Sequence, residues 1–146
     1  MKKSVSEELD FIPATCVGAQ VRKLSRIVSK KYNDVFSPFG INLSQAHLLF
    51  ATSTKHGILQ TEIACALVLE RSTIHRDIKR LIDRNFLKLE KNVGIKSPSV
   101  YLTKEGKSFV KGLLPVWKKT QSELEKLLGN EMIGNIPVMS ARLNKK

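Results

Sequence analysis

The stretch that decides the fold reads TEIACALVLERSTIHRDIKRLIDR and runs from Thr61 to Arg84. Its first part, Glu62–Leu67, is a short apolar segment that favours a helix, which the Thr61 hydroxyl can cap. After a tight turn, Ser72 can cap a second helix over 72–84. The apolar residues of this second helix recur at helical spacing and form one stripe, made of Ile74, Ile78, Leu81 and Ile82. Two short helices joined by a tight turn predict a helix-turn-helix.

The segments on either side of this stretch extend the pattern. Upstream, Asn42 or Ser44 can cap a helix that contains Ala46, Leu48, Leu49 and Ala51. Downstream, residues 86–91 and 99–102 alternate between apolar and polar, and the gap between them carries Gly94 and Pro98, which predicts a short β-hairpin. The order helix, short helix, turn, helix and basic hairpin predicts a mainly α fold with a small β-hairpin wing, a winged helix-turn-helix.

The face of helix 72–84 opposite its apolar stripe is polar and basic. In an arbitrary protein such a face is simply solvated, but between a tight turn and a basic hairpin it matches a helix that enters the major groove of DNA. The residues expected to reach the groove are Ser72, Thr73, His75, Arg76 and Lys79. Basic residues that flank this face or follow it are expected to contact phosphates rather than bases, and these are Arg71, Arg80, Arg84 and Lys91.

Two further helical segments lie outside the winged unit. Residues 16–36 form an amphipathic pattern that includes Val17, Val21 and Leu24. A long helix begins after Thr103, with Pro115 expected to bend or interrupt it, and a weaker segment covers 132–143. The long helix carries an apolar stripe of Phe109, Leu113, Trp117, Leu124 and Leu128. This stripe exceeds what a small winged domain can cover, so we expect a partner chain to bury it; packing within the chain is the alternative.

Composition limits the class of partner. The chain has 146 residues, with 25 Lys and Arg against 13 Asp and Glu, and a formal net charge of +12. This excess predicts a polyanionic partner, either nucleic acid, an anionic lipid surface or an acidic protein. The longest wholly apolar run, 63–69, is far shorter than the roughly 20 residues that span a bilayer. No apolar signal stretch follows Met1, so we expect a cytoplasmic protein of one domain without a membrane partner.

The chemistry-bearing residues do not form a catalytic or metal pattern. Cys16 and Cys65 have no other Cys or His at ligand spacing, and we expect both thiols to be buried and inert. The sequence contains no glycine-rich phosphate loop and no nucleophile elbow, and His47, His56 and His75 are scattered. We therefore expect neither an enzyme nor a bound metal or cofactor.

Several short motifs together resemble the MarR family of transcription regulators. They are Asn42-Leu43-Ser44-Gln45, Thr61-Glu62-Ile63-Ala64, Glu70-Arg71-Ser72-Thr73-Ile74 and Leu102-Thr103-Lys104-Glu105-Gly106, and the resemblance covers about residues 14 to 129. The wing departs from the family, whose members usually carry Asp-x-Arg there. This chain has Gly94, Ile95 and Lys96 instead. Lys96 keeps a positive charge for DNA but lacks the planar fork of arginine.

The resemblance implies a homodimer in which the N-terminal and C-terminal helices of two chains interlock. It assigns 1–146 to one domain, with dimerisation helices in 13–36 and 104–146 and a DNA-binding lobe in 42–103. It also implies a repressor that binds a pseudo-palindromic operator and is relieved by a small aromatic or anionic ligand. Two alternatives remain, namely a basic winged-helix module that contacts protein or RNA, and a redox-sensing regulator that uses Cys16. The sensors of this family surround their thiol with tyrosines, whereas this chain has only Tyr32 and Tyr101.

Overall fold

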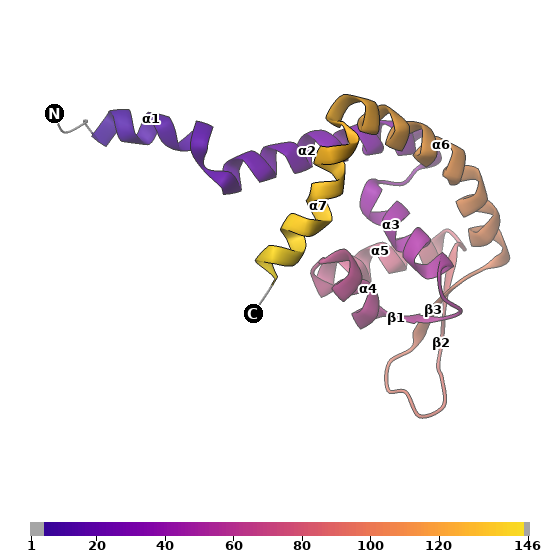
Figure 1. Cartoon of the computed structure of the whole chain (residues 1–146). Coiled ribbons are helices and arrows are strands. Elements are labelled where there is room, and N and C mark those ends of the chain that lie inside the picture. Colours follow the sequence, from indigo (N-terminus) through magenta and orange to yellow (C-terminus); the bar gives the residue numbers. More distant parts are fainter. Residues whose placement is uncertain (1–4, 145–146) are drawn as a thin grey trace.

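The computed structural model describes residues 5–144 and is mainly helical (Figure 1). In chain order its elements are α1 (Val5–Thr15), α2 (Val17–Phe36), the 3-10 helix η1 (Ser37–Phe39), α3 (Leu43–Ser53), β1 (Ile58–Leu59), α4 (Gln60–Leu67), α5 (Arg71–Asp83), β2 (Leu87–Glu90), β3 (Ser99–Leu102), α6 (Lys104–Leu128) and α7 (Asn130–Leu143). The first four residues of the expected domain and the last two of the segment 104–146 lie outside the described residues. None of the described helices combines the length and apolarity needed to cross a bilayer.

The structure contains the predicted helix-turn-helix, but two of its helices begin at other residues than the sequence predicted. Asn42 caps α3 as predicted, because its side-chain oxygen accepts from the Gln45 amide at 2.9 Å. The prediction that Thr61 caps the next helix is wrong, since α4 begins at Gln60, two residues before the predicted start, and Thr61 lies inside its first turn. The prediction that Ser72 caps α5 is also wrong, because α5 begins at Arg71 and Ser72 lies inside its first turn.

A carboxylate, not a hydroxyl, stabilises the start of α4. Glu62 accepts a hydrogen bond from the Leu59 amide at 2.9 Å and another from Lys55 Nζ at 3.1 Å. The bond from the Leu59 amide and the nearby Lys55 ammonium both lower the pKa of Glu62, because they favour its charged form. The short helix therefore depends on a negative charge near its positive end.

The sheet contains the predicted hairpin and one additional strand. Strands β2 and β3 pair antiparallel, with Leu87 opposite Leu102, and β1 pairs with the other edge of β3, with Ile58 opposite Val100. The sequence did not reveal β1 because a two-residue strand carries no alternation. We call β2, β3 and the loop 91–98 between them the wing.

The core fixes which face of α5 points outward. Ile74, Ile78 and Leu81 are at most 2% exposed, and they lie in one cluster with Leu49 of α3 and Val100 of β3. Burial of a large aliphatic side chain stabilises the fold by roughly 1.5–3 kcal/mol. The stripe therefore holds α5 against the core and leaves its opposite face outside.

The apolar stripe of the long helix α6 is covered by other parts of the same chain to a greater extent than expected. Pro115 lies inside α6 without interrupting it, and Figure 1 shows the helix as an arc around α2 and α3. The prediction that its apolar stripe needs a second chain is wrong for Leu113 and Leu124, which are 0% and 6% exposed in the single chain. Phe109 stacks on Phe86 with ring centroids 4.1 Å apart, so the stripe packs largely within the chain.

Candidate nucleic-acid interface

The outward face of α5 carries the residues that the sequence assigned to the major groove. Ser72, His75, Arg76 and Lys79 are exposed, and Thr73 is half-buried. Beneath them lies the buried stripe that anchors the helix. The face consists of hydroxyl, imidazole, guanidinium and ammonium groups, which can donate hydrogen bonds to base edges and to phosphate oxygens.

A buried carboxylate that sequence reasoning missed fixes the position of α5. Asp77 is 4% exposed, and it accepts hydrogen bonds from Ser44 Oγ at 2.8 Å and from Gln45 Nε2 at 3.2 Å. These bonds join the middle of α5 to the first turn of α3. Arg80 also lies on this carboxylate, with Nη1 3.7 Å from Asp77 Oδ1, so its guanidinium is partly oriented by it. The sequence offered one sign of this role, because Asp77 is an acidic residue next to the apolar residues of the stripe on α5.

Arg84, predicted to contact the DNA backbone, joins the end of α5 to the segment before α3. Its guanidinium donates to the carbonyl oxygens of Gly40 at 2.7 Å and Phe39 at 3.0 Å. It also lies over the ring of Phe86, 4.7 Å from the centroid. Because its head group is already bonded to the segment before α3, the structure gives Arg84 a structural role, and its contact with the DNA backbone stays a prediction.

This structural role gives a stability prediction. Arg84→Ala is expected to destabilise the fold by about 1–2 kcal/mol, since the substitution removes two hydrogen bonds and a cation–π interaction at a partly solvated site. Arg84→Lys should recover little, because an ammonium lacks the fork that reaches two carbonyls. Urea unfolding followed by circular dichroism measures both. Unchanged stability together with weakened DNA binding would favour the contact with the DNA backbone instead.

The wing stands beside the first turn of α5. A hollow of about 170 Å³ between them is lined by Gln60, Thr61, Arg71, Ile74, Ser97 and Pro98. Asn92 braces the base of the loop by donating to Ser99 Oγ at 2.7 Å. Lys91 and Lys96 are exposed, and the loop 91–98 contains no acidic residue. The wing and the start of α5 thus present one basic surface, with Arg71 between them.

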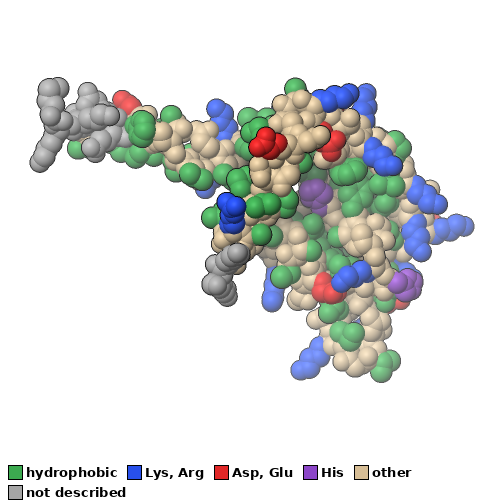
Figure 2. Space-filling view, viewed as in Figure 1, with side chains coloured by type: hydrophobic (Ala, Val, Ile, Leu, Met, Phe, Trp, Pro, Cys, Tyr) green, Lys and Arg blue, Asp and Glu red, His purple; other side chains and the backbone are tan. Residues whose placement is uncertain are grey.

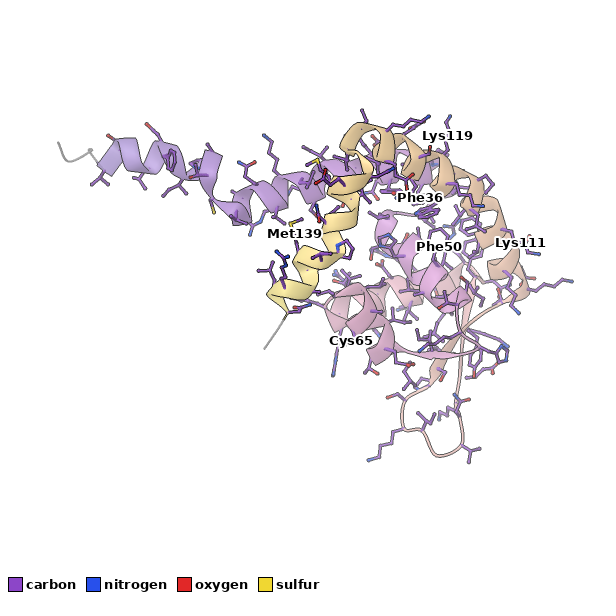
Figure 3. All side chains as sticks on the ribbon, in the orientation of Figure 1. Phe36, Phe50, Cys65, Lys111, Lys119 and Met139 are labelled. Atoms are coloured by element: carbon purple, nitrogen blue, oxygen red, sulfur yellow. The ribbon has the colours of Figure 1, made fainter. Side chains whose placement is uncertain are left out.

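The burial of the two cysteine thiols differs from the prediction. Cys16 and Cys65 are both free and exposed, so the prediction of buried thiols is wrong. Cys16 lies at the junction of α1 and α2, outside the packed core, and Cys65 lies on the outer side of the short helix α4, where Figure 3 labels it. Among residues 5–144, no group of three His, Cys, Asp or Glu side chains could hold a metal ion.

Apolar side chains remain uncovered far from α5. Val17, Val21 and Leu24, assigned to a dimer interface from the sequence, are 75%, 59% and 45% exposed. The space-filling view shows hydrophobic side chains along the projecting arm that α1 and the start of α2 form (Figure 2). Other large apolar side chains exposed on α1 and α7 are Val5, Leu9, Phe11, Ile12, Met132, Ile136, Val138, Met139 and Leu143.

Comparison with known proteins finds a family match in the middle of the chain. Residues 39–94, from η1 to the wing loop, match the model of the MarR family. The HTH-type transcriptional regulator YwoH of Bacillus subtilis (strain 168), itself uncharacterized, is 33% identical over 86 residues. That alignment covers 59% of this chain and 63% of YwoH, less than two thirds of its length.

Two solved structures share the fold over nearly the whole chain. A MarR variant from E. coli in complex with operator DNA is 18% identical, with a TM-score of 0.79 over 92% of this chain and 98% of that one. BpsR of Bordetella bronchiseptica, studied for regulation of its DNA binding by 6-hydroxynicotinic acid, is 16% identical, with a TM-score of 0.76 over 90% and 96%. The family and these neighbours are transcription regulators, not enzymes, in agreement with the sequence prediction. Residues 39–94 of this chain thus match the MarR family within a winged fold that nearly the whole chain shares with a MarR structure.

Proposed function

We propose that the chain is a transcriptional regulator that binds double-stranded DNA by placing α5 in the major groove. The observation that carries the proposal is the exposed face of Arg76, His75 and Lys79 on a helix whose other face is locked into the core. An α-helix fits the major groove, and these side chains match the acceptors that base edges and phosphates present. The fold is shared with a MarR variant that was solved with operator DNA.

The net charge of +12 supports the same proposal, because a DNA-binding protein gains affinity by releasing counterions from phosphates. Gel-shift assays with the DNA upstream of its own gene, against a scrambled duplex as competitor, test it. Preferential retention of the upstream duplex is expected. Equal binding of both duplexes would favour the alternative of a winged module used for RNA or protein contact.

We propose that the wing contacts phosphates through Lys96, without the base reading that arginine would add. Lys96→Ala is expected to weaken binding to specific and random duplexes alike. A plot of the logarithm of the binding constant against the logarithm of the salt concentration has a negative slope. The magnitude of this slope should fall by about one unit for each phosphate contact that is lost, summed over both chains of a dimer. Fluorescence anisotropy at several salt concentrations measures this, with Lys119→Ala on the outer side of α6 as a matched control. An unchanged slope would place the wing away from DNA.

We propose that the functional form is a homodimer joined through the apolar faces of α1, the first half of α2, and α7. Fully burying each large apolar side chain stabilises an association by roughly 1.5–3 kcal/mol, and the uncovered set on these helices is large. Two α5 helices related by a twofold axis would then read a pseudo-palindromic operator. Val17, Val21 and Leu24 keep their assigned role in this proposal, whereas Leu113 and Leu124 do not.

The proposal extends to whether the protein represses or activates transcription and to what controls it. We propose a cytoplasmic repressor whose DNA binding is relieved by a small ligand, and the regulation of BpsR by 6-hydroxynicotinic acid supports this mode. Measurement of transcription from the upstream promoter in strains with and without the gene tests the sign. Higher transcription without the gene is expected, and lower transcription would identify an activator.

A further inference from the structure

The outer end of the wing is apolar, although the loop around it is polar and basic. We call residues 92–95 the wing tip. The tip is a tight turn, closed by a hydrogen bond from the Ile95 amide to the Asn92 carbonyl oxygen at 3.2 Å. Gly94 has φ 80°, a left-handed conformation that glycine adopts without strain. The turn leaves Val93 fully exposed and Ile95 46% exposed.

The fold of the single chain does not use these two aliphatic side chains. Neither Val93 nor Ile95 belongs to the core cluster or to the partly buried residues packed against it. Figure 1 shows the wing loop as the lowest part of the molecule, and Figure 2 shows hydrophobic side chains there beside a basic one. Apolar surface held in water at the end of a hairpin is unfavourable, so contact with a partner would stabilise it.

The charges beside the tip indicate which partner covers it. Lys91 and Lys96 flank the tip, are exposed, and form no ion pair with any residue that the structure describes. The loop 91–98 contains no acidic residue, and its basic surface continues through the exposed Arg71 to the start of α5. The tip is therefore the far end of the surface that we propose to lie on DNA, and its charges favour a polyanion over an uncharged apolar partner.

The minor groove of duplex DNA has the matching chemistry. It is about 6 Å wide, it is bordered by phosphates on both sides, and the edges of bases and the carbon atoms of deoxyribose line its interior. An aliphatic tip fits the interior, and a lysine on each side of the tip can reach the bordering phosphates. An acidic protein surface would pair the lysines but offer no apolar recess between its charges.

We propose that Val93 and Ile95 enter the minor groove beside the base pairs that α5 contacts and partly unstack one flexible base step there. The inference rests on the proposed function, because it needs α5 in the neighbouring major groove. Apolar side chains that insert into the minor groove separate stacked bases and kink the duplex. TA and CA/TG steps allow this most easily, so the tip selects deformable DNA without hydrogen bonds to bases.

A pair of double variants separates the apolar contact from the charges. Val93→Ser combined with Ile95→Ser removes both aliphatic side chains and no charge, and it should bind the upstream duplex at least about tenfold more weakly. The salt dependence of binding should stay that of the parent, because no phosphate contact is lost. Val93→Leu combined with Ile95→Leu keeps an apolar tip and should bind within about twofold of the parent. Fluorescence anisotropy measures all three proteins, and circular dichroism should show intact helices in each.

A fluorescent base tests the unstacking itself. 2-Aminopurine, whose fluorescence rises when it is unstacked, replaces the adenines of the upstream duplex one at a time on both strands. TA and CA/TG steps all contain an adenine, so the scan covers every flexible step. Saturating parent protein should raise the fluorescence at such a step, outside the base pairs whose recognition depends on Arg76. The leucine pair should do the same, and the serine pair at saturation should not.

The failure of this inference can be told apart from the failure of the proposed function. A parent that prefers the upstream duplex but raises the fluorescence at no adenine would overturn the inference alone. So would a serine pair that binds as tightly as the parent or gives an equal rise in fluorescence. A parent without preference for the upstream duplex in gel shift would overturn both.

Discussion

Carrying Val21→Glu together with Leu24→Glu, the protein is expected to be a folded monomer. Both side chains are more than two-fifths exposed in the single chain, so the substitutions remove little packing from the monomer's fold. In a dimer that buries this face of α2, two carboxylates per chain would lose their hydration without a partner, which is strongly unfavourable. Light scattering after gel filtration at micromolar concentration measures the mass, and the parent should be a dimer.

A matched control separates the position of the new charges from their number. Arg22→Glu combined with Arg26→Glu also places two glutamates on α2, but on its opposite face, and it should remain dimeric. A first variant that stays dimeric would contradict the proposed interface. A parent that is a monodisperse monomer would contradict the dimer altogether.

Dissociation of the dimer has a consequence for DNA. In a dimer, once one α5 helix is bound to its half-site, the second α5 helix is held close to the other half-site at a high effective concentration. A monomer lacks this advantage, so the affinity of the monomeric variant for the whole operator should fall by about 10²–10⁴-fold. Its binding to an isolated half-site should change far less, because the α5 face is untouched. An equal fall on both duplexes would indicate damage to the DNA-binding lobe instead.

The second large effect is expected for Arg76→Ala. Arg76 is exposed at the middle of the polar face of α5, beside the buried Ile78 and Asp77 that hold the helix in place. If its guanidinium contacts a base pair, its removal costs about 1–3 kcal/mol per half-site and relaxes the preference at that base pair. The fold should be spared because the side chain is exposed. Arg26→Ala, an exposed arginine on the outer face of α2, is the control and should bind as the parent does.

The winged unit could be predicted from sequence because each of its signals is local. The Asn42 cap, the stripe Ile74–Ile78–Leu81 and the alternation that predicted the hairpin depend on neighbours a few residues away, and the structure has the cap, the buried stripe and the hairpin. The polar face of α5 followed from the same stripe. The helix starts could not be read from a capping hydroxyl, because α4 depends on the Glu62 carboxylate and no side chain caps α5.

The remaining features depend on contacts between distant segments, which spacing does not encode. The bond from Arg84 to Gly40 joins residues 44 positions apart, and that from Ser44 to Asp77 joins residues 33 apart. From sequence alone, Arg84 at the end of α5 could contact either DNA or the protein itself. Asp77 beside the apolar stripe could likewise be either exposed or buried until the fold is known. The stripe of α6 was correctly identified as apolar, but whether Leu113 faced its own chain or a partner required the three-dimensional arrangement.

The most direct test of the central claim is fluorescence anisotropy of a labelled duplex from the protein's own upstream region, titrated with the parent and with Arg76→Ala at equal salt. A scrambled duplex of the same composition runs in parallel. The account predicts that the parent prefers the upstream duplex and that Arg76→Ala reduces this preference by at least about tenfold, with its helices intact by circular dichroism. A folded Arg76→Ala variant that binds the upstream duplex as tightly and selectively as the parent would contradict the assignment of α5 to the major groove.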